Sequence, residues 1–242
     1  MEIITSKAAI SPVVHKAIDT YRAGSLKAFV KMLDKTVLHR KVKFPILEYA
    51  AAELYKGIPE EEQLTVTDSI IDCRQTGSYV IAGYMLQLRL AAHFDECFAK
   101  AIDYIIQGDE WYVCDIIGER VIGHGLLVYP IKAIPALKIM AAHDNKWIVR
   151  AVGVATHYAV KKGLKKQYAD EMYGLLLQLA GTTEFHTKKG VGWAAKTIAK
   201  FHPDIIEQHK AALEIDDIKQ WFKTKVKIGL GRTGKYAHRH TS

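Results

Sequence analysis

The chain has 242 residues, of which 49% are hydrophobic and 25% charged, and its formal net charge is +8. This composition supports a buried core and excludes bulk disorder, and no apolar run reaches the roughly 18 residues that a membrane-spanning helix needs. The N-terminus lacks the features of a secretory signal, and the three cysteines form no Cys-x-x-Cys pair, so we expect a cytoplasmic protein.

Almost every segment has the spacing of an amphipathic helix, with apolar residues three or four positions apart. Ser11 and Pro12 predict the start of the first helix, because serine is a favoured N-cap and proline suits the first helical position. Further helices are predicted over 25–38, 45–56, 59–74, 77–91, 94–106, 109–124, 130–142, 145–162, 165–180, 186–200 and 203–222.

Short connections between these segments favour antiparallel packing of neighbouring helices. About a dozen such helices predict an all-α protein, an α-solenoid of stacked antiparallel helix pairs (HEAT-like repeats). We expect one repeat domain over residues 1–222. Residues 223–242 are basic and glycine-rich, and we expect them to form a short tail or a small hairpin, with 225–228 as its strand-like part.

The positive charge is concentrated in two parts of the chain. Residues 143–200 contain ten basic and four acidic side chains, and residues 223–242 contain six basic and no acidic ones. Residues 1–142 are nearly neutral, with a net charge of −1. This distribution favours a polyanionic partner, and a solvated basic face is the alternative.

Three tryptophans recur at roughly the spacing of a helix pair, each followed by a charged residue one turn later. The pairs are Trp111 with Asp115, Trp147 with Arg150, and Trp193 with Lys196. In one interpretation the tryptophans are core residues and the charges join helices. In the other, parallel helices bring the pairs to one face, where indoles contact sugar or base and cations contact phosphate.

The second interpretation predicts a DNA-binding surface. Its expected contact residues are Trp111, Trp147, Arg150, Lys188, Lys189, Trp193, Lys196 and, in the tail, Arg232. Asp115 is the exception, because a carboxylate facing a polyanion is unfavourable unless it has a function. Stabilising positive charge on a sugar is one such function, so Asp115 is the candidate catalytic residue.

The tail contains two further motifs that we interpret as incidental. Gly229-Leu-Gly231-Arg-Thr-Gly234 matches a dinucleotide-binding pattern but lies in no strand–helix unit, so no cofactor is expected. His238-x-His240 has no third ligand nearby, so no metal site is expected.

Three segments resemble a known family. Asp109-Glu-Trp111-Tyr-Val-Cys-Asp115, Asp144-Asn-Lys-Trp147-Ile-Val-Arg150 and Phe185-His-Thr-Lys188-Lys-Gly-Val-Gly-Trp193-Ala-Ala-Lys196 are similar, in order and spacing, to segments of the DNA alkylation repair superfamily of HEAT-like-repeat proteins. That superfamily comprises AlkD/AlkC-type glycosylases and their AlkF/AlkG-type relatives. The resemblance covers roughly residues 94–210. Lys196 departs from it, because the family often has arginine there, whose planar fork binds phosphate through two hydrogen bonds.

The resemblance implies a protein that binds double-stranded or branched DNA, and we expect a monomer. If the chain is an enzyme, the resemblance implies a monofunctional glycosylase that removes N3- or N7-alkylated purines. Asp115 would then stabilise an oxocarbenium-like sugar and position the attacking water. Trp111 and Trp193 would pack on the lesion nucleotide, and Arg150 would hold phosphate.

Two alternatives remain. A non-catalytic relative of the AlkF/AlkG type would bind branched DNA such as four-way junctions on the same fold. A protein–protein scaffold, a common use of α-solenoids, would place the tryptophans in the core.

Overall fold

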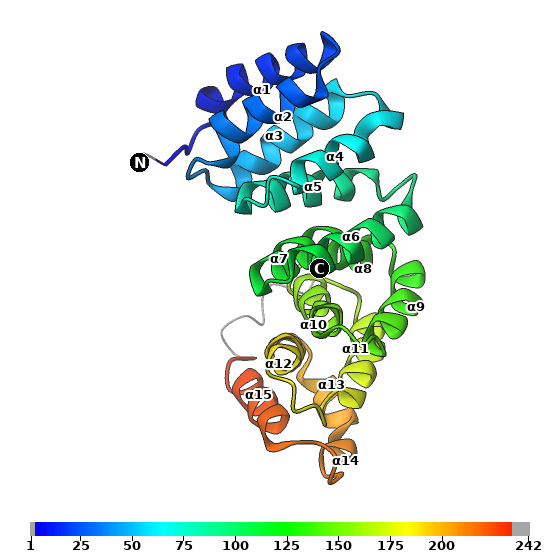
Figure 1. The fold of residues 1–242 in the computed structure, drawn as a ribbon. Coiled ribbons are helices and arrows are strands. Elements are labelled where there is room, and N and C mark those ends of the chain that lie inside the picture. The colour runs from blue at the N-terminus through cyan, green and yellow to red at the C-terminus, as the bar shows by residue number, and fades with distance from the viewer. Residues whose placement is uncertain (1–2, 234–242) are drawn as a thin grey trace. The chain divides into compact units, whose positions relative to one another are not determined.

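The computed structural model describes residues 3–233, and the regular structure within that range is almost entirely helical (Figure 1). The α-helices are α1 (Lys7–Arg22), α2 (Leu26–Leu33), α3 (Phe44–Gly57), α4 (Gln63–Ile71), α5 (Thr76–Arg89), α6 (Phe94–Gly108), α7 (Trp111–Ile117), α8 (His124–Val128), α9 (Pro130–Ala141), α10 (Lys146–Lys161), α11 (Lys166–Gln178), α12 (Phe185–Phe201), α13 (Pro203–Gln208), α14 (Lys210–Leu213) and α15 (Gln220–Leu230). Two π-helical segments, Asp34–Leu38 and Gly118–Gly123, continue α2 and α7. A 3-10 turn, Glu60–Glu62, precedes α4.

The chain divides into two compact units, residues 1–104 and 105–242. In the first unit α1 packs against α2 and α3, and α3 packs against α5. Helices α1 and α3 run parallel, because Tyr49 donates a hydrogen bond to Ser11 and, one turn further along both helices, Glu53 contacts His15. Alternate helices therefore stack directly on each other, as repeated helix pairs require.

The second unit contains a row of parallel helices formed by α7 with its π-helical continuation, α10, α12 and α15, called here the parallel row. Figure 1 shows α10, α12 and α15 side by side. The register is set by contacts of Asp115 with Arg150, His157 with Thr197, and Gly229 with the Lys196 carbonyl. Each joins residues 33 to 40 positions apart, the length of one helix pair, which confirms the predicted α-solenoid of stacked pairs.

Glycines allow the helices of this row to approach closely. A Cβ atom on Gly153 of α10 would lie 2.2 Å from the Gly190 carbonyl carbon of α12. A Cβ on Gly190 would in turn lie 2.5 Å from the Arg150 carbonyl oxygen. Both distances are too short for any side chain, so this contact brings the two backbones together and fixes α10 against α12.

Two expectations about helix boundaries were wrong. The first helix begins at Lys7, with the Ser6 hydroxyl accepting a hydrogen bond from the Ala9 amide, so Pro12 lies inside α1 rather than at its start. Pro12 is exposed, while the opposite face buries Ile10 and Val14, which keeps the helix continuous. The helix expected over 203–222 is broken into α13, α14 and the first turn of α15.

The start of the predicted tail also differs from expectation. Residues 225–228 lie in helix α15 rather than in a strand or hairpin. Phe222, Val226 and Gly229 form its buried face, and their spacing of four and three residues is helical. Residues 234–242, which include His238 and His240, lie outside the described residues.

No helix within residues 3–233 is long and apolar enough to cross a membrane. The extent of the repeat domain, 1–222, stays a prediction.

Candidate functional site

Asp115 and Arg150 form a two-point ion pair between α7 and α10. Arg150 Nε donates to one carboxylate oxygen of Asp115 at 2.9 Å, and a terminal guanidinium nitrogen donates to the other at 2.8 Å. The remaining terminal nitrogen donates to the His186 carbonyl at 3.2 Å, at the start of α12. The Arg150 side chain is 8% exposed and that of Asp115 19%. Arg150 therefore orients the carboxylate and joins three helices of the parallel row.

Trp111 is exposed at the first position of α7, one turn before Asp115. Its relative exposure is 54%, far above that of an ordinary core tryptophan. Its indole meets the neighbouring Tyr112 ring edge to face at 6.0 Å. An exposed indole beside a fixed carboxylate is available to a ligand that approaches α7.

Trp147 lies in the core, which differs from the prediction that it contacts DNA. It is only 3% exposed, and its indole Nε1 donates to the Asp109 carboxylate at 2.6 Å. Its ring also packs against that of His186, with centroids 4.3 Å apart. Asp109 has a left-handed backbone, with φ +44°, in the turn between α6 and α7. This hydrogen bond joins the turn before α7 to the start of α10.

Trp193, in the middle of α12, stacks on a buried histidine of α10. The ring centroids of Trp193 and His157 are 3.8 Å apart, with the planes inclined by 23°. His157 Nδ1 lies 2.7 Å from the Thr197 hydroxyl, which donates to the Trp193 carbonyl at 2.9 Å. Because the Thr197 hydroxyl donates its proton to that carbonyl, it accepts a hydrogen bond from His157 Nδ1–H. The proton of the neutral imidazole is therefore on Nδ1.

The His157 imidazole is neutral at physiological pH. Burial lowers its pKa to about 3, and the positive charges of Lys161, Lys196 and Lys200 lower it further in the same direction. The neutral ring stacks on the Trp193 indole and places no further positive charge beside these lysines. Only the packing of α10 against α12 reveals this position of His157.

Basic and aromatic residues form a stripe along α12. Phe185, Lys189, Trp193, Lys196 and Lys200 follow one another at intervals of four, four, three and four residues, the period of one helix face. The Lys189 ammonium lies 5.0 Å from the centre of the Phe185 ring, which is 58% exposed. Lys188 lies beside the stripe and is half-buried. Helix α12 therefore contains these lysines together with Trp193.

Arg232 approaches this stripe from the end of α15. Burial lowers the pKa of Lys196, and the positive charges of Arg232, Lys225 and Lys200 lower it further. Arg232 follows Gly229, which packs against the Lys196 carbonyl, so Arg232 lies near Lys196 although they are 36 residues apart in sequence. Lys225 was not among the predicted contacts, although Arg232 of the same basic segment was.

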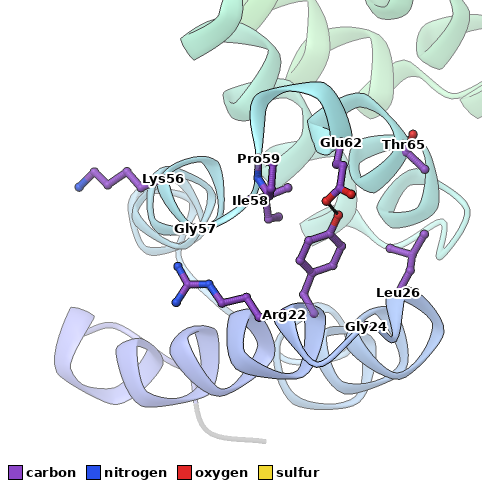
Figure 2. A pocket seen from close by; sticks show the side chains of 10 residues that line it. Arg22, Gly24, Leu26, Lys56, Gly57, Ile58, Pro59, Glu62 and Thr65 are labelled. Atoms are coloured by element: carbon purple, nitrogen blue, oxygen red, sulfur yellow. Dashed lines mark hydrogen bonds between the residues drawn. The ribbon is translucent and has the colours of Figure 1, made fainter.

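A cavity in the first unit contains none of these residues (Figure 2). It has a volume of about 890 Å³ and lies at the ends of α1 and α3. The Tyr21 hydroxyl donates to the Glu62 carboxylate across it. Burial and this carboxylate raise the pKa of Tyr21 to about 12, so the phenol keeps its proton at neutral pH. None of the predicted site residues lines this cavity.

Among residues 3–233, no group of three or more histidine, cysteine or acidic side chains is placed to hold a metal ion. The parallel row thus brings together an oriented carboxylate, the exposed Trp111 indole, the half-buried Trp193 indole and several cations.

A family model described as DNA alkylation repair enzyme matches residues 13–217. The matched range includes α7, α10 and α12 entire and ends before α15 begins. No curated protein and no solved structure matches the chain significantly.

Proposed function

The chain belongs to the DNA alkylation repair enzyme family, and we propose that it binds DNA through the parallel row and excises N3- or N7-alkylated purines. The observation that carries the proposal is the Asp115 carboxylate, held by Arg150 one turn from the exposed Trp111. Arg150 thereby fixes the orientation of Asp115 within the parallel row, which also contains Trp193 and the α12 lysines.

The reaction requires the protein mainly to position a carboxylate beside the sugar. An N3- or N7-alkylated purine is already positively charged, and the N-glycosidic bond breaks as the base leaves with the bonding electrons and becomes neutral. The sugar develops positive charge at C1′, which a carboxylate stabilises. Water then bonds to C1′, and its released proton passes to solvent by way of the Asp115 carboxylate. The reaction needs no general acid at the base.

The DNA is held by stacking and charge in this proposal. Trp111 and Trp193 offer π surfaces to the sugar or base of the lesion nucleotide. Lys188, Lys189 and Lys196 on α12, with Arg232, neutralise backbone phosphates. Arg150 acts mainly by positioning Asp115, because three of its N–H groups are engaged within the protein.

Two observations favour alternative functions. Both Asp115 oxygens accept hydrogen bonds from Arg150, which suits a structural pair in a non-catalytic binder of branched DNA. The burial of Trp147 is what a protein–protein scaffold predicts. The exposure of Trp111 argues against the scaffold, because an indole that only filled the core would be covered.

An excision assay separates these functions. We expect wild-type protein to release 7-methylguanine or 3-methyladenine from alkylated duplex DNA, and Asp115→Asn to lower the rate about 100-fold or more while retaining DNA binding. Thermal melting of both proteins checks that the variant is folded. Salt-sensitive binding to four-way junctions without release of either base would instead establish the non-catalytic binder. Absence of binding to any DNA would contradict both.

A further inference from the structure

Helix α15 lies beyond the family match, which ends at residue 217, and yet it continues the parallel row. It packs along α12, with Gly229 so close that a Cβ atom would lie 2.4 Å from the Lys196 carbonyl oxygen. This contact places the end of α15 beside the middle of α12. The residues of α15 that flank the contact therefore face the Trp193 region.

The side chain of Lys225, on α15, lies across α12. A Cβ atom at Gly192 would lie 3.0 Å from Lys225 Cγ and 3.4 Å from the Trp221 ring, so both side chains lie over this glycine. Gly192 directly precedes Trp193 and is one turn before Lys196. Because Gly192 has no side chain, the Lys225 stem can lie flat on α12 and bring its ammonium group towards Lys196.

Lys196, Lys225 and Arg232 form what we call the α15 cation cluster. Lys225 lies over Gly192, and the Arg232 amide donates at 2.9 Å to the carbonyl of Gly229, the glycine that packs against the Lys196 carbonyl. Burial lowers the pKa of Lys196, and the positive charges of Arg232 and Lys225 lower it further. Within residues 3–233 no ion pair joins any of the three cluster members to an acidic side chain. Like charges gathered without a counter-charge repel one another in the free protein, and a polyanion relieves that repulsion.

The spacing along α12 locates what the cluster would contact. Arg150, which holds Asp115, meets α12 at His186 and Gly190, whereas the cluster lies around Lys196. Six to ten residues of helix at 1.5 Å each separate these points by about 9–15 Å. Asp115 itself lies on α7, with α10 between it and α12, so the cluster would contact the DNA backbone away from the nucleotide at Asp115.

We propose that the α15 cation cluster binds the DNA backbone away from the nucleotide at Asp115. The proposal rests on the DNA-binding function proposed above and extends its footprint onto a helix outside the family match. Lys225 and Arg232 contact phosphate, and Gly192 provides the surface along which Lys225 reaches it.

The test is the salt dependence of DNA affinity, measured by fluorescence anisotropy with a labelled 20-base-pair duplex. Lys225→Gln/Arg232→Gln removes two charges from the cluster. Lys223→Gln/Lys227→Gln removes two charges from the other flank of α15, since residues 223 and 227 lie about 160–200° around the helix from residue 225. We expect the slope of log affinity against log salt to become shallower by about 1 to 2 in the cluster variant. In the matched control it should stay at the wild-type value.

The outcomes distinguish this inference from the function on which it rests. Salt-dependent binding by wild type, with the cluster variant and the control showing equal slopes, would overturn the cluster and leave the proposed function intact. If wild-type protein bound no DNA, both would be overturned. Circular dichroism melting of both variants checks that α15 remains folded.

Discussion

At the scale of single residues, the Asp115–Arg150 pair combines two properties that are usually separate. It joins neighbouring helices as a structural ion pair does, with Arg150 almost fully buried. At the same time it leaves part of a carboxylate accessible next to an exposed indole, Trp111. A carboxylate whose orientation is fixed before the substrate arrives costs little reorganisation during the reaction, which is the condition for electrostatic catalysis.

His157 makes the stability of the fold depend on pH. In the folded protein the imidazole stays neutral down to a pH of about 3, its folded-state pKa. In the unfolded chain it takes up a proton below its ordinary pKa of about 6.5. Between these values, lowering the pH favours the unfolded chain, and the free energy of unfolding falls by up to about 1.4 kcal/mol per pH unit.

We therefore predict that His157→Phe reduces the pH dependence of stability. The phenyl ring can still stack on Trp193 but binds no proton. Between pH 7 and pH 5, the free energy of unfolding of wild type should fall by about 2 kcal/mol more than that of the variant. Urea denaturation at the two pH values measures the difference. Parallel pH profiles would show that His157 is protonated in the folded protein.

At the scale of the elements, the site depends on how closely α10 and α12 approach. The backbone contact at Gly153 and Gly190 lies within one turn of Arg150 and so determines where the guanidinium meets α12. Any separation of the two helices weakens the hydrogen bond of Arg150 to the His186 carbonyl, which helps to hold the guanidinium in place. The position of Arg150 thus depends on two glycines that have no chemical role of their own.

A matched pair of alanine substitutions tests this contact. Gly190→Ala places a methyl group against the Arg150 backbone and is expected to lower the free energy of unfolding by about 1–3 kcal/mol. Gly174→Ala, in the middle of α11, meets no atom within 4 Å and should raise it by about 0.5–1 kcal/mol through helix propensity. Urea denaturation compares both with wild type. Equal effects of the two substitutions would contradict the close approach.

Helix periodicity was sufficient to predict most elements, because each helix buries one face at a regular interval. It did not predict the breaks at π-helical turns or the division of 203–222, where apolar spacing continues through a change in backbone geometry. Most of helix α15 was missed because lysines at every second position, Lys223, Lys225 and Lys227, gave the segment a strand-like pattern. Its core contacts depend on Phe222 and Val226 alone among large residues.

The candidate site was predictable only in part. Spacing and resemblance identified Asp115, Arg150 and Trp193, because those residues occur at the interval of one helix pair. They could not separate the exposed Trp111 from the buried Trp147, since both begin a helix and carry a charge one turn later. Which of the two faces outward depends on a turn conformation at Asp109, and this appears only in three dimensions.

At the scale of the whole molecule, the charge distribution corresponds to the arrangement of helices in the second unit. The basic residues of 143–200 lie on α10, α11, α12 and their connections, and α15 adds further cations beside α12. Charge that is dispersed along the sequence is thus gathered by the parallel row. A polyanion that contacts Trp193 would meet several of these cations at once, so its affinity should decrease steeply with salt.

The affinity of Trp111→Ala for DNA tests the central claim, that this row presents an aromatic and basic face to DNA. Because the Trp111 indole is exposed, its removal should change the free energy of unfolding by no more than about 0.5 kcal/mol. The same substitution should weaken binding to alkylated duplex DNA by about 1–3 kcal/mol, or roughly 5- to 150-fold, through loss of stacking. Anisotropy titration at one fixed salt concentration measures this. An affinity equal to that of wild type would contradict the account.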